Sequence, residues 1–143
     1  MNRLRVSILQ TDIAWENKQD NLRRLREQLE TLRGATEIVV LPETFSTGFS
    51  MNTDRLAEPV TDKTIATLRQ WAAECQIALA GSYISCDEIP VASEDNELSY
   101  KHPAYYNRAF FLTPEGKVIS TTNVTCSAWG MRQNILRQAL NVP

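Results

Sequence analysis

The amino-acid sequence predicts an α/β fold, and three observations support this prediction. The opening of the chain alternates a strand-like segment, an amphipathic stretch and a second strand-like segment. Leucines recur through the amphipathic stretch at intervals of three and four residues, so they share one face of a helix. Two later strand-like segments flank a Thr-Pro-Glu-Gly sequence, which is typical of a turn. The length of 143 residues fits one domain or a large piece of one.

The opening segments predict a β-α-β unit. Residues 4–10 mix branched apolar and polar side chains, as strands do. Asn17 or Asp20 then begins a helix, and Gly34 ends it as a C-cap. Residues 38–41 form a continuous apolar run of the kind that is buried on both faces of a parallel sheet. Because a helix joins the two strands, we expect them to pair in parallel.

The next part of the chain predicts a second helix followed by more strands. Thr61 or Asp62 begins this helix, whose apolar face ends at Cys75. Residues 77–84 form another strand, and the polar residues 86–102 are typical of a solvated insertion or hairpin tip. The remaining predicted elements are a strand over 105–112, a turn over 113–116 and a strand over 117–119.

Composition and charge narrow the class of protein. Leu, Ile, Val and Phe make up 35 of 143 residues, which exceeds the roughly 20% below which chains tend to be disordered. We therefore expect a packed core. Fifteen basic and seventeen acidic side chains give a net charge of −2. Because both signs are interspersed, no basic face for nucleic acid is expected.

Cysteine usage and hydropathy indicate the compartment. Three cysteines lie far apart, which argues against a disulfide framework and for a reducing environment. The longest apolar run, residues 38–42, is far shorter than the ~18 residues of a membrane span, and no signal-peptide pattern begins the chain. We expect a cytoplasmic protein without a membrane partner.

The residues that follow the second predicted strand contain the strongest candidate for chemistry. Pro42 ends the strand and Glu43 comes directly after it, at the edge of an α/β sheet where ligands bind. With Phe45 and Phe49 beside it, the carboxylate would be partly desolvated, which suits a general base. The alternative is a solvated Glu in a loop, because most carboxylates in clefts are not catalytic.

Other residues give weaker signals. The Ser46-Thr47-Gly48 stretch could cradle a phosphate, although such a loop normally follows the first strand and leads into a helix. Among the cysteines, Cys75 lies on an apolar helix face and Cys86 begins an acidic segment that disfavours its thiolate. The single histidine, His102, has no cluster of ligands around it, so we expect no metal site and no cofactor.

Four segments follow one another along the chain in a recognisable pattern: residues 4–12, Asn17 with Asn21 and Leu22, residues 39–43, and residues 106–116. Together they resemble the nitrilase, or carbon-nitrogen hydrolase, superfamily. The continuation over residues 44–49 is most similar to the bacterial omega-amidases that act on 2-oxoglutaramate-type amides. The polar segment over 86–102 is longer than the family usually shows.

The resemblance implies the N-terminal part of a four-layer α-β-β-α sandwich. It also implies a Glu general base, a Lys that stabilises the tetrahedral intermediate and a Cys nucleophile that forms a thioester. Glu43 falls on the family's Glu. The Lys and the Cys do not map, because Lys101 precedes the Asn-Arg strand, Lys117 lies on the turn, and Cys126 stands where the segment after the Lys is expected.

We therefore expect a partial hydrolase domain over residues 1–119 and an aberrant tail over residues 120–143. When the codons for residues 120–136 are read one register over, from the third base of the Ser120 codon, synonymous choices spell Tyr-Asp-Lys-Arg-His-Leu-Phe-Arg-Met-Gly-Asp-Glu-Thr-Lys-His-Phe. This string is similar to the missing family segment and includes its lysine. Our hypothesis is a frameshifted or truncated tail, the alternative is a divergent ending, and the coding DNA decides between them.

Three functions stay open from the sequence. The first is an omega-amidase-like hydrolase that converts a small omega-amido 2-oxo acid to the acid and ammonia, with Glu43 as base. The second is a non-catalytic fragment of that enzyme, and we expect this chain to be inactive because no nucleophile maps. The third is an α/β module that binds a phosphate ligand. The resemblance implies a small amide as partner and homo-oligomers among full-length relatives.

Overall fold

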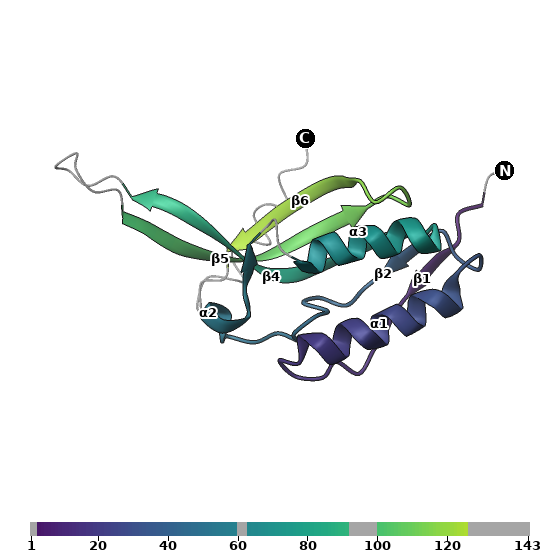
Figure 1. Ribbon diagram of the computed structural model, residues 1–143, viewed down its shortest axis with the longest axis horizontal. Coiled ribbons are helices and arrows are strands. Elements are labelled where there is room, and N and C mark those ends of the chain that lie inside the picture. The colour runs from purple at the N-terminus through teal and green to yellow at the C-terminus, as the bar shows by residue number, and fades with distance from the viewer. Residues whose placement is uncertain (1–2, 60–62, 92–99, 126–143) are drawn as a thin grey trace.

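The computed structural model describes residues 3–59, 63–91 and 100–125. Its strands form one mixed sheet in the order β1-β2-β4-β5-β6, with β3 paired to β4 beside this row. The helices α1 and α3 pack against one face of the sheet, and the β4–β5 hairpin reaches well beyond them (Figure 1). This arrangement confirms the predicted α/β class. Residues 126–143, which include Cys126 and most of the predicted tail, lie outside the described residues.

The predicted β-α-β unit is present. Strands β1 (Val6–Ile8) and β2 (Ile38–Val40) pair in parallel, with Val6 opposite Ile38 and Ile8 opposite Val40. Between them, helix α1 (Lys18–Leu32) begins after Asn17, whose side chain accepts a hydrogen bond from the backbone N–H of Asp20. This N-cap satisfies one of the amide groups that the first helical turn leaves unpaired.

Two short elements that the sequence did not predict connect this unit to the next helix. They are α2 (Thr53–Leu56) and β3 (Glu58–Pro59). Glu58 is buried and is neutralised by an ion pair with Lys18 at the start of α1, and it also accepts a hydrogen bond of 2.9 Å from the Thr64 hydroxyl. The pair therefore joins α1, β3 and α3 (Lys63–Cys75). The predicted start of α3, at Thr61 or Asp62, lies outside the described residues.

The second half of the sheet is built from longer strands than the sequence predicted. Strand β4 (Ala78–Val91) pairs antiparallel with β5 (Tyr100–Leu112), and β5 pairs antiparallel with β6 (Val118–Thr125). The segment over residues 86–102 was predicted as a solvated insertion or a hairpin tip. The hairpin alternative fits the antiparallel pairing, but the strands reach further than expected, because the cross-strand ladder continues to the pair Val91 and Tyr100. A two-stranded ribbon needs no hydrophobic core of its own to satisfy its backbone, so a polar sequence can still form strands.

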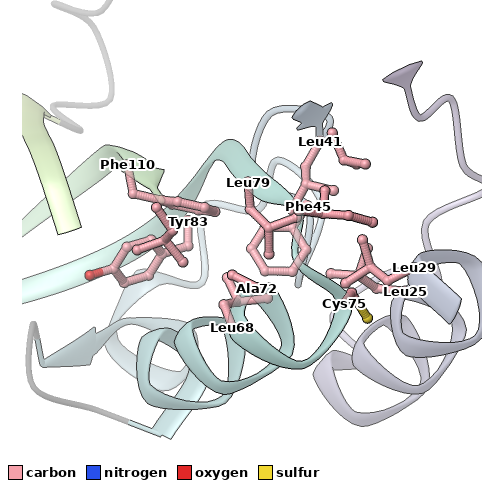
Figure 2. Packing of buried hydrophobic residues seen from close by; sticks show 13 residues of the cluster. Leu25, Leu29, Leu41, Phe45, Leu68, Ala72, Cys75, Leu79, Tyr83 and Phe110 are labelled. Atoms are coloured by element: carbon pink, nitrogen blue, oxygen red, sulfur yellow. The ribbon is translucent and has the colours of Figure 1, made fainter. Parts of the chain in front are cut away.

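The hydrophobic core lies between the sheet and the two long helices. Figure 2 shows leucines of α1 and α3 meeting Phe45, Tyr83 and Phe110 from the sheet side. The Phe45 and Phe110 rings pack edge to face, with their centroids 6.1 Å apart. The predicted apolar face of α3 is confirmed, since Leu68, Ala72 and Cys75 are all buried in this cluster.

The opposite face of the sheet is partly exposed. Ile8 is 78% exposed and Val6 is 50% exposed, while the side chains of Ile38 and Val40 are only partly buried. The expectation that residues 38–41 are buried on both faces is therefore wrong for the described part of the chain. Alternation along β2 directs Val39 to the helices, and it directs its two neighbours to the face that no described helix covers.

Candidate active site

The candidate base, Glu43, lies just beyond the carboxyl end of β2. The chain still follows β4 at this point, because the backbone N–H of Leu41 donates to the Ala80 carbonyl at 2.8 Å. Glu43 itself is exposed, so the expectation of partial desolvation is wrong. The two flanking rings do not enclose it: Phe45 is buried in the helix-side core, and Phe49 is 48% exposed.

The backbone directly after Glu43 is strained. Thr44 has a φ of 46°, in the left-handed region that β-branched residues rarely occupy. Its N–H donates to the Ser82 hydroxyl oxygen at 3.0 Å, and the N–H of Phe45 donates to the Ser82 carbonyl at 3.2 Å. One residue of β4 therefore holds the reversal that sends Phe45 into the core and leaves Glu43 on the outer side.

The carboxylate of Glu43 has a specific polar contact. Asn107 Nδ2 donates to Glu43 Oε1 over 2.6 Å, and the two residues are 64 positions apart in the chain. Asn107 is 9% exposed. On β5 it follows the alternation opposite to Phe110 and Leu112, which enter the helix-side core, so Asn107 projects from the other face of the sheet.

The neighbouring residue, Arg108, projects toward the helix side and is buried there. Its Nε donates to the Ser85 hydroxyl at 2.9 Å, and its Nη2 contacts the carboxylate of Asp87 at 2.6 Å. The guanidinium also lies 5.9 Å from the centre of the Tyr106 ring. The two neighbouring residues therefore act on opposite faces of the sheet. Arg108 holds β5 against β4, and Asn107 contacts Glu43 on the other face.

Helix α1 holds the turn after Glu43 through Asn21. The Nδ2 group of Asn21 donates to the carbonyl oxygens of Ala14 and Ser46, both at 2.8 Å. Its Oδ1 accepts from the N–H of Ala14, also at 2.8 Å. Asn21 belongs to the family pattern in the sequence, but no local signal there indicated its role. Its buried, fully bonded amide joins the segment before α1, the helix and the Glu43 turn.

A second polar cluster holds the far end of the same turn. Glu16 accepts hydrogen bonds from the Ser50 hydroxyl and from Arg55 Nη2, each at 2.5 Å. The Ser50 hydrogen bond is the main cause that lowers the pKa of Glu16 below its ordinary 4.5, and the positive charge of Arg55 adds to it. The N–H of Glu16 also donates to the Thr47 carbonyl at 2.8 Å.

The hydrogen bonds inside this turn argue against the alternative that residues 46–48 bind a phosphate. Ser46 and Thr47 are buried. The N–H groups of Thr47 and Gly48 both donate to the carbonyl oxygen of Thr44, at 3.0 and 2.8 Å. The Thr47 hydroxyl donates to the Gly48 carbonyl. Because these donors are used inside the turn, they are not available to an anion.

No described cysteine contacts Glu43 through a hydrogen bond. Cys75 is buried in the helix-side core, on the other side of the sheet from Asn107. Cys86 shares the outer face with Asn107 but stands two residues beyond Ile84, the cross-strand partner of Asn107. This offset is about 7 Å along the strand. Lys117 is exposed on the turn before β6. The side chains of Lys101 and His102 lie outside the described part.

The described residues also contain little enclosed space near the site. A cavity of about 20 Å³ lies between α1 and the Glu43 segment, lined in part by Leu25, Gln28 and Pro42. This volume holds about one water molecule, so it is no substrate pocket. Within the described ranges, no group of three His, Cys, Asp or Glu side chains could bind a metal ion. None of the helices there is both long and apolar enough to cross a membrane.

Comparison with known proteins adds independent information. The sequence profile of the carbon-nitrogen hydrolase family matches residues 5–125. A protein called omega-amidase YafV from Yersinia enterocolitica is 37% identical over 119 residues, which is 83% of this chain and 40% of that protein. The chain therefore spans less than half of the length of this relative.

Solved structures give the same result. A carbon-nitrogen hydrolase superfamily protein from Xanthomonas campestris, with an arsenic adduct in its active site, superposes with a TM-score of 0.67 at 30% identity, over 86% of this chain and 41% of that one. An amidase from Nesterenkonia, with acrylamide added at its active-site cysteine, superposes with a TM-score of 0.61 at 16% identity, over 85% of this chain and 44% of that one. The second likeness shows a shared fold.

Proposed function

The chain belongs to the carbon-nitrogen hydrolase family, and we propose that it carries the part of an omega-amidase-type active site that holds the general base, Glu43. The observation that carries the proposal is the position of this carboxylate. It stands at the carboxyl end of a parallel strand, open to solvent on one side and hydrogen-bonded by the buried Asn107 on the other. A general base needs this combination of access and fixed orientation.

In the proposed reaction, Glu43 takes the proton of a cysteine thiol. The thiolate attacks the carbonyl carbon of a small amide, the C–N bond breaks, and the proton passes from Glu43 to the leaving ammonia. Water then attacks the thioester, Glu43 takes a proton from this water, and the carboxylic acid leaves as the thiol forms again. The substrate class we propose is an omega-amido 2-oxo acid, in view of the relationship to omega-amidase YafV.

We further propose that this chain alone is inactive. The described cysteines do not suit the role of nucleophile, since Cys75 is buried on the helix side of the sheet and Cys86 is offset along β4. The nucleophile and the lysine would then come from residues beyond those described. When one member of a cooperating catalytic set is missing, only residual catalysis remains.

The experiment is an ammonia-release assay on omega-amides, including 2-oxoglutaramate. The chain as it stands is compared with a version in which one base is added or removed near codon 120, so that the frame is restored through a full C-terminal half. We expect turnover from the restored chain and none from the original one. Sequencing the gene through codon 120 provides the matching genetic evidence, because an intact frame would remove the frameshift hypothesis.

Glu43→Gln in the restored chain tests the assignment of the base. Loss of a general base costs about 10²–10⁴-fold in turnover. The control is Glu27→Gln, since Glu27 is exposed on α1 and pairs only with Arg23 among the described residues. Activity that survives Glu43→Gln would reject the base, and a restored chain inactive on every amide would reject the reaction class.

A further inference from the structure

We propose that Asn107 is the positioning residue for the Glu43 carboxylate. This inference rests on the proposed function, in which Glu43 is the base. Asn107 Nδ2 donates to Glu43 Oε1 at 2.6 Å. In the described part of the chain, no other side chain forms a hydrogen bond with this carboxylate. A single donor therefore sets the direction of an otherwise exposed group.

Asn107 can do this because its own position is fixed. Its backbone lies inside the sheet, with Ile84 of β4 as partner on one side and Val124 of β6 on the other. The next residue, Arg108, is held on the opposite face by Ser85 and Asp87. Neither the backbone nor the direction of the Asn107 side chain can change without disturbing these contacts.

The amide also has a defined orientation. Rotating it by half a turn would bring Oδ1 against Glu43 Oε1, and two acceptors at this distance repel each other when the carboxylate is ionised. The observed orientation presents the N–H to the anion, which is the charge-assisted and stronger form of this hydrogen bond. Asn107 therefore fixes the direction of the Glu43 carboxylate through Oε1.

The side-chain oxygen of Asn107, Oδ1, indicates that this residue does more than stabilise the fold. Asn107 Oδ1 is buried and has no hydrogen-bond partner among the described residues. Burying an unpaired polar atom has a free-energy cost, which an apolar side chain of similar size would avoid. A residue that serves only to stabilise β5 would not need this amide. The amide is explained by what its Nδ2 group does for Glu43.

As a consequence, the two carboxylate oxygens of Glu43 have different roles. Oε1 is held by Asn107, and Oε2 has no partner among the described residues. Proton transfer would then use Oε2. Fixing one oxygen restricts the rotation of the carboxylate and keeps the reacting oxygen in one place. The entropy of orienting this oxygen is then lost on folding and not during the reaction.

The first test uses the full chain and needs no turnover. In urea unfolding, Asn107→Asp places two carboxylates in contact and should raise the unfolding equilibrium constant at neutral pH by about tenfold or more. Asn107→Leu should change it by less than about threefold, because the loss of one hydrogen bond is offset by removal of the unpaired Oδ1. Asn17→Asp is the matched control, since Asp caps a helix as well as Asn does.

The second test is an exchange of donor and acceptor. In the double variant Glu43→Gln with Asn107→Asp, the amide introduced at position 43 can donate to the carboxylate introduced at position 107, so the hydrogen bond returns with its direction reversed. We expect most of the stability lost in Asn107→Asp to return. If the double variant is no more stable than Asn107→Asp, or if Asn107→Asp is as mild as Asn17→Asp, the contact does not hold Glu43 and the proposal is overturned.

A spectroscopic signature separates positioning from general packing. In the full chain labelled with [15N]asparagine, one side-chain amide proton of Asn107 should be shifted downfield by the carboxylate. Glu43→Leu should move it toward the values of exposed asparagines such as Asn17, whereas Glu43→Gln, which keeps an acceptor, should move it less. A signal that Glu43→Leu leaves unchanged would overturn the proposal.

The frame-restored chain gives the kinetic readout. Asn107→Leu should lower kcat and leave KM within about twofold, because Asn107 orients the base without binding substrate. A rise in KM at unchanged kcat would contradict positioning. If the restored chain hydrolyses no amide while the unfolding and spectroscopic results hold, the proposed function has failed and the contact between Asn107 and Glu43 stands.

Discussion

Asn21 and Ser46 are 25 residues apart in the chain and are joined by a hydrogen bond of 2.8 Å from Asn21 Nδ2 to the Ser46 carbonyl oxygen. The same amide forms two hydrogen bonds to the backbone of Ala14. One buried side chain on α1 therefore fixes the turn that carries Glu43. The candidate site depends on the first helix as well as on the sheet.

This relationship predicts a large effect for Asn21→Leu. The change removes three hydrogen bonds and leaves two carbonyl oxygens and one N–H without their partner. Since each buried group left unpaired costs about 1–3 kcal/mol, we expect a loss of about 3 kcal/mol or more in the free energy of unfolding, measured in urea by circular dichroism. Asn17→Ala, which removes only an N-cap, should cost about 1 kcal/mol. Equal losses in the two variants would contradict the role of Asn21.

Two glycines with the same backbone conformation provide a matched pair of variants. Gly34 has a φ of 76° and Gly48 has a φ of 75°. A Cβ added at Gly34 meets nothing within 4 Å, whereas one at Gly48 lies 3.1 Å from the Trp15 ring. Gly34→Ala should therefore cost only the left-handed backbone, about 1 kcal/mol. Gly48→Ala should cost about 2–4 kcal/mol, because the ring must also move.

The readout for this pair is thermal unfolding together with the fluorescence of Trp15. Only Gly48→Ala should change the emission, since Trp15 packs on that glycine. If both variants lose the same stability, the contact with Trp15 contributes nothing.

Local sequence patterns predicted the elements that depend on local chemistry. The leucine stripe and the Asn17 cap predicted α1, and the apolar face ending at Cys75 predicted α3, because burying one face of a helix produces a visible period. Glu43 was found in the same way, since the end of a strand is marked by a proline. These signals lie within a few residues of the feature that they predict.

The features that were missed depend on partners far away in the sequence. Nothing near Glu43 shows that Phe45 turns into the core, because that reversal needs the left-handed Thr44 and its hydrogen bond to Ser82. The two flanking phenylalanines therefore suggested a desolvation that the structure does not have. The contact between Glu43 and Asn107 spans 64 residues, and no local pattern reports it.

The length of the β4–β5 hairpin was missed for a different reason. Residues 86–102 are rich in Asp, Glu and Ser, which suggested a solvated insertion or the tip of a hairpin and not regular strands. An antiparallel ribbon is stabilised by backbone hydrogen bonds between its two strands, and composition carries little information about them. The ion pair between the buried Arg108 and the partly exposed Asp87 is a specific side-chain contact between the two strands of this hairpin.

The Glu16 cluster predicts a pH dependence with a defined sign. The pKa of Glu16 is lowered in the folded chain, chiefly by the hydrogen bond from Ser50 and further by Arg55. Its stabilising contribution is therefore present above the ordinary value of 4.5 and is lost as the pH falls through the lower folded pKa. Glu16→Gln should be less stable than the parent near neutral pH, and the difference should shrink in acid.

The measurement is the unfolding midpoint in urea from pH 7 down to pH 3. Glu30→Gln removes a carboxylate on the exposed side of α1 and is the control for the loss of one surface charge. Asp20 and Glu74 also have lowered pKa values. The stability of the parent therefore still falls with falling pH when Glu16 is replaced, and Glu16→Gln only makes this dependence weaker. A constant difference between parent and Glu16→Gln at every pH would contradict the prediction.

The outer face of the sheet predicts how the chain behaves at high concentration. Val6 and Ile8 share this face with the partly exposed Ile38 and Val40, and Ile8 is the most exposed of the large apolar residues described. Contiguous apolar surface on a strand at the edge of a sheet favours association, because both the side chains and the unpaired backbone groups gain partners. We expect sedimentation velocity to show self-association that grows with concentration.

Ile8→Ser should weaken this self-association, and it should change the free energy of unfolding by less than about 0.5 kcal/mol, because the side chain is already in solvent. Met51→Ser, at an apolar residue of the loop before α2 that is 54% exposed, should leave the association unchanged. If Ile8→Ser has no more effect than Met51→Ser, association uses another surface, and the exposed face of β1 and β2 is not what brings the chains together.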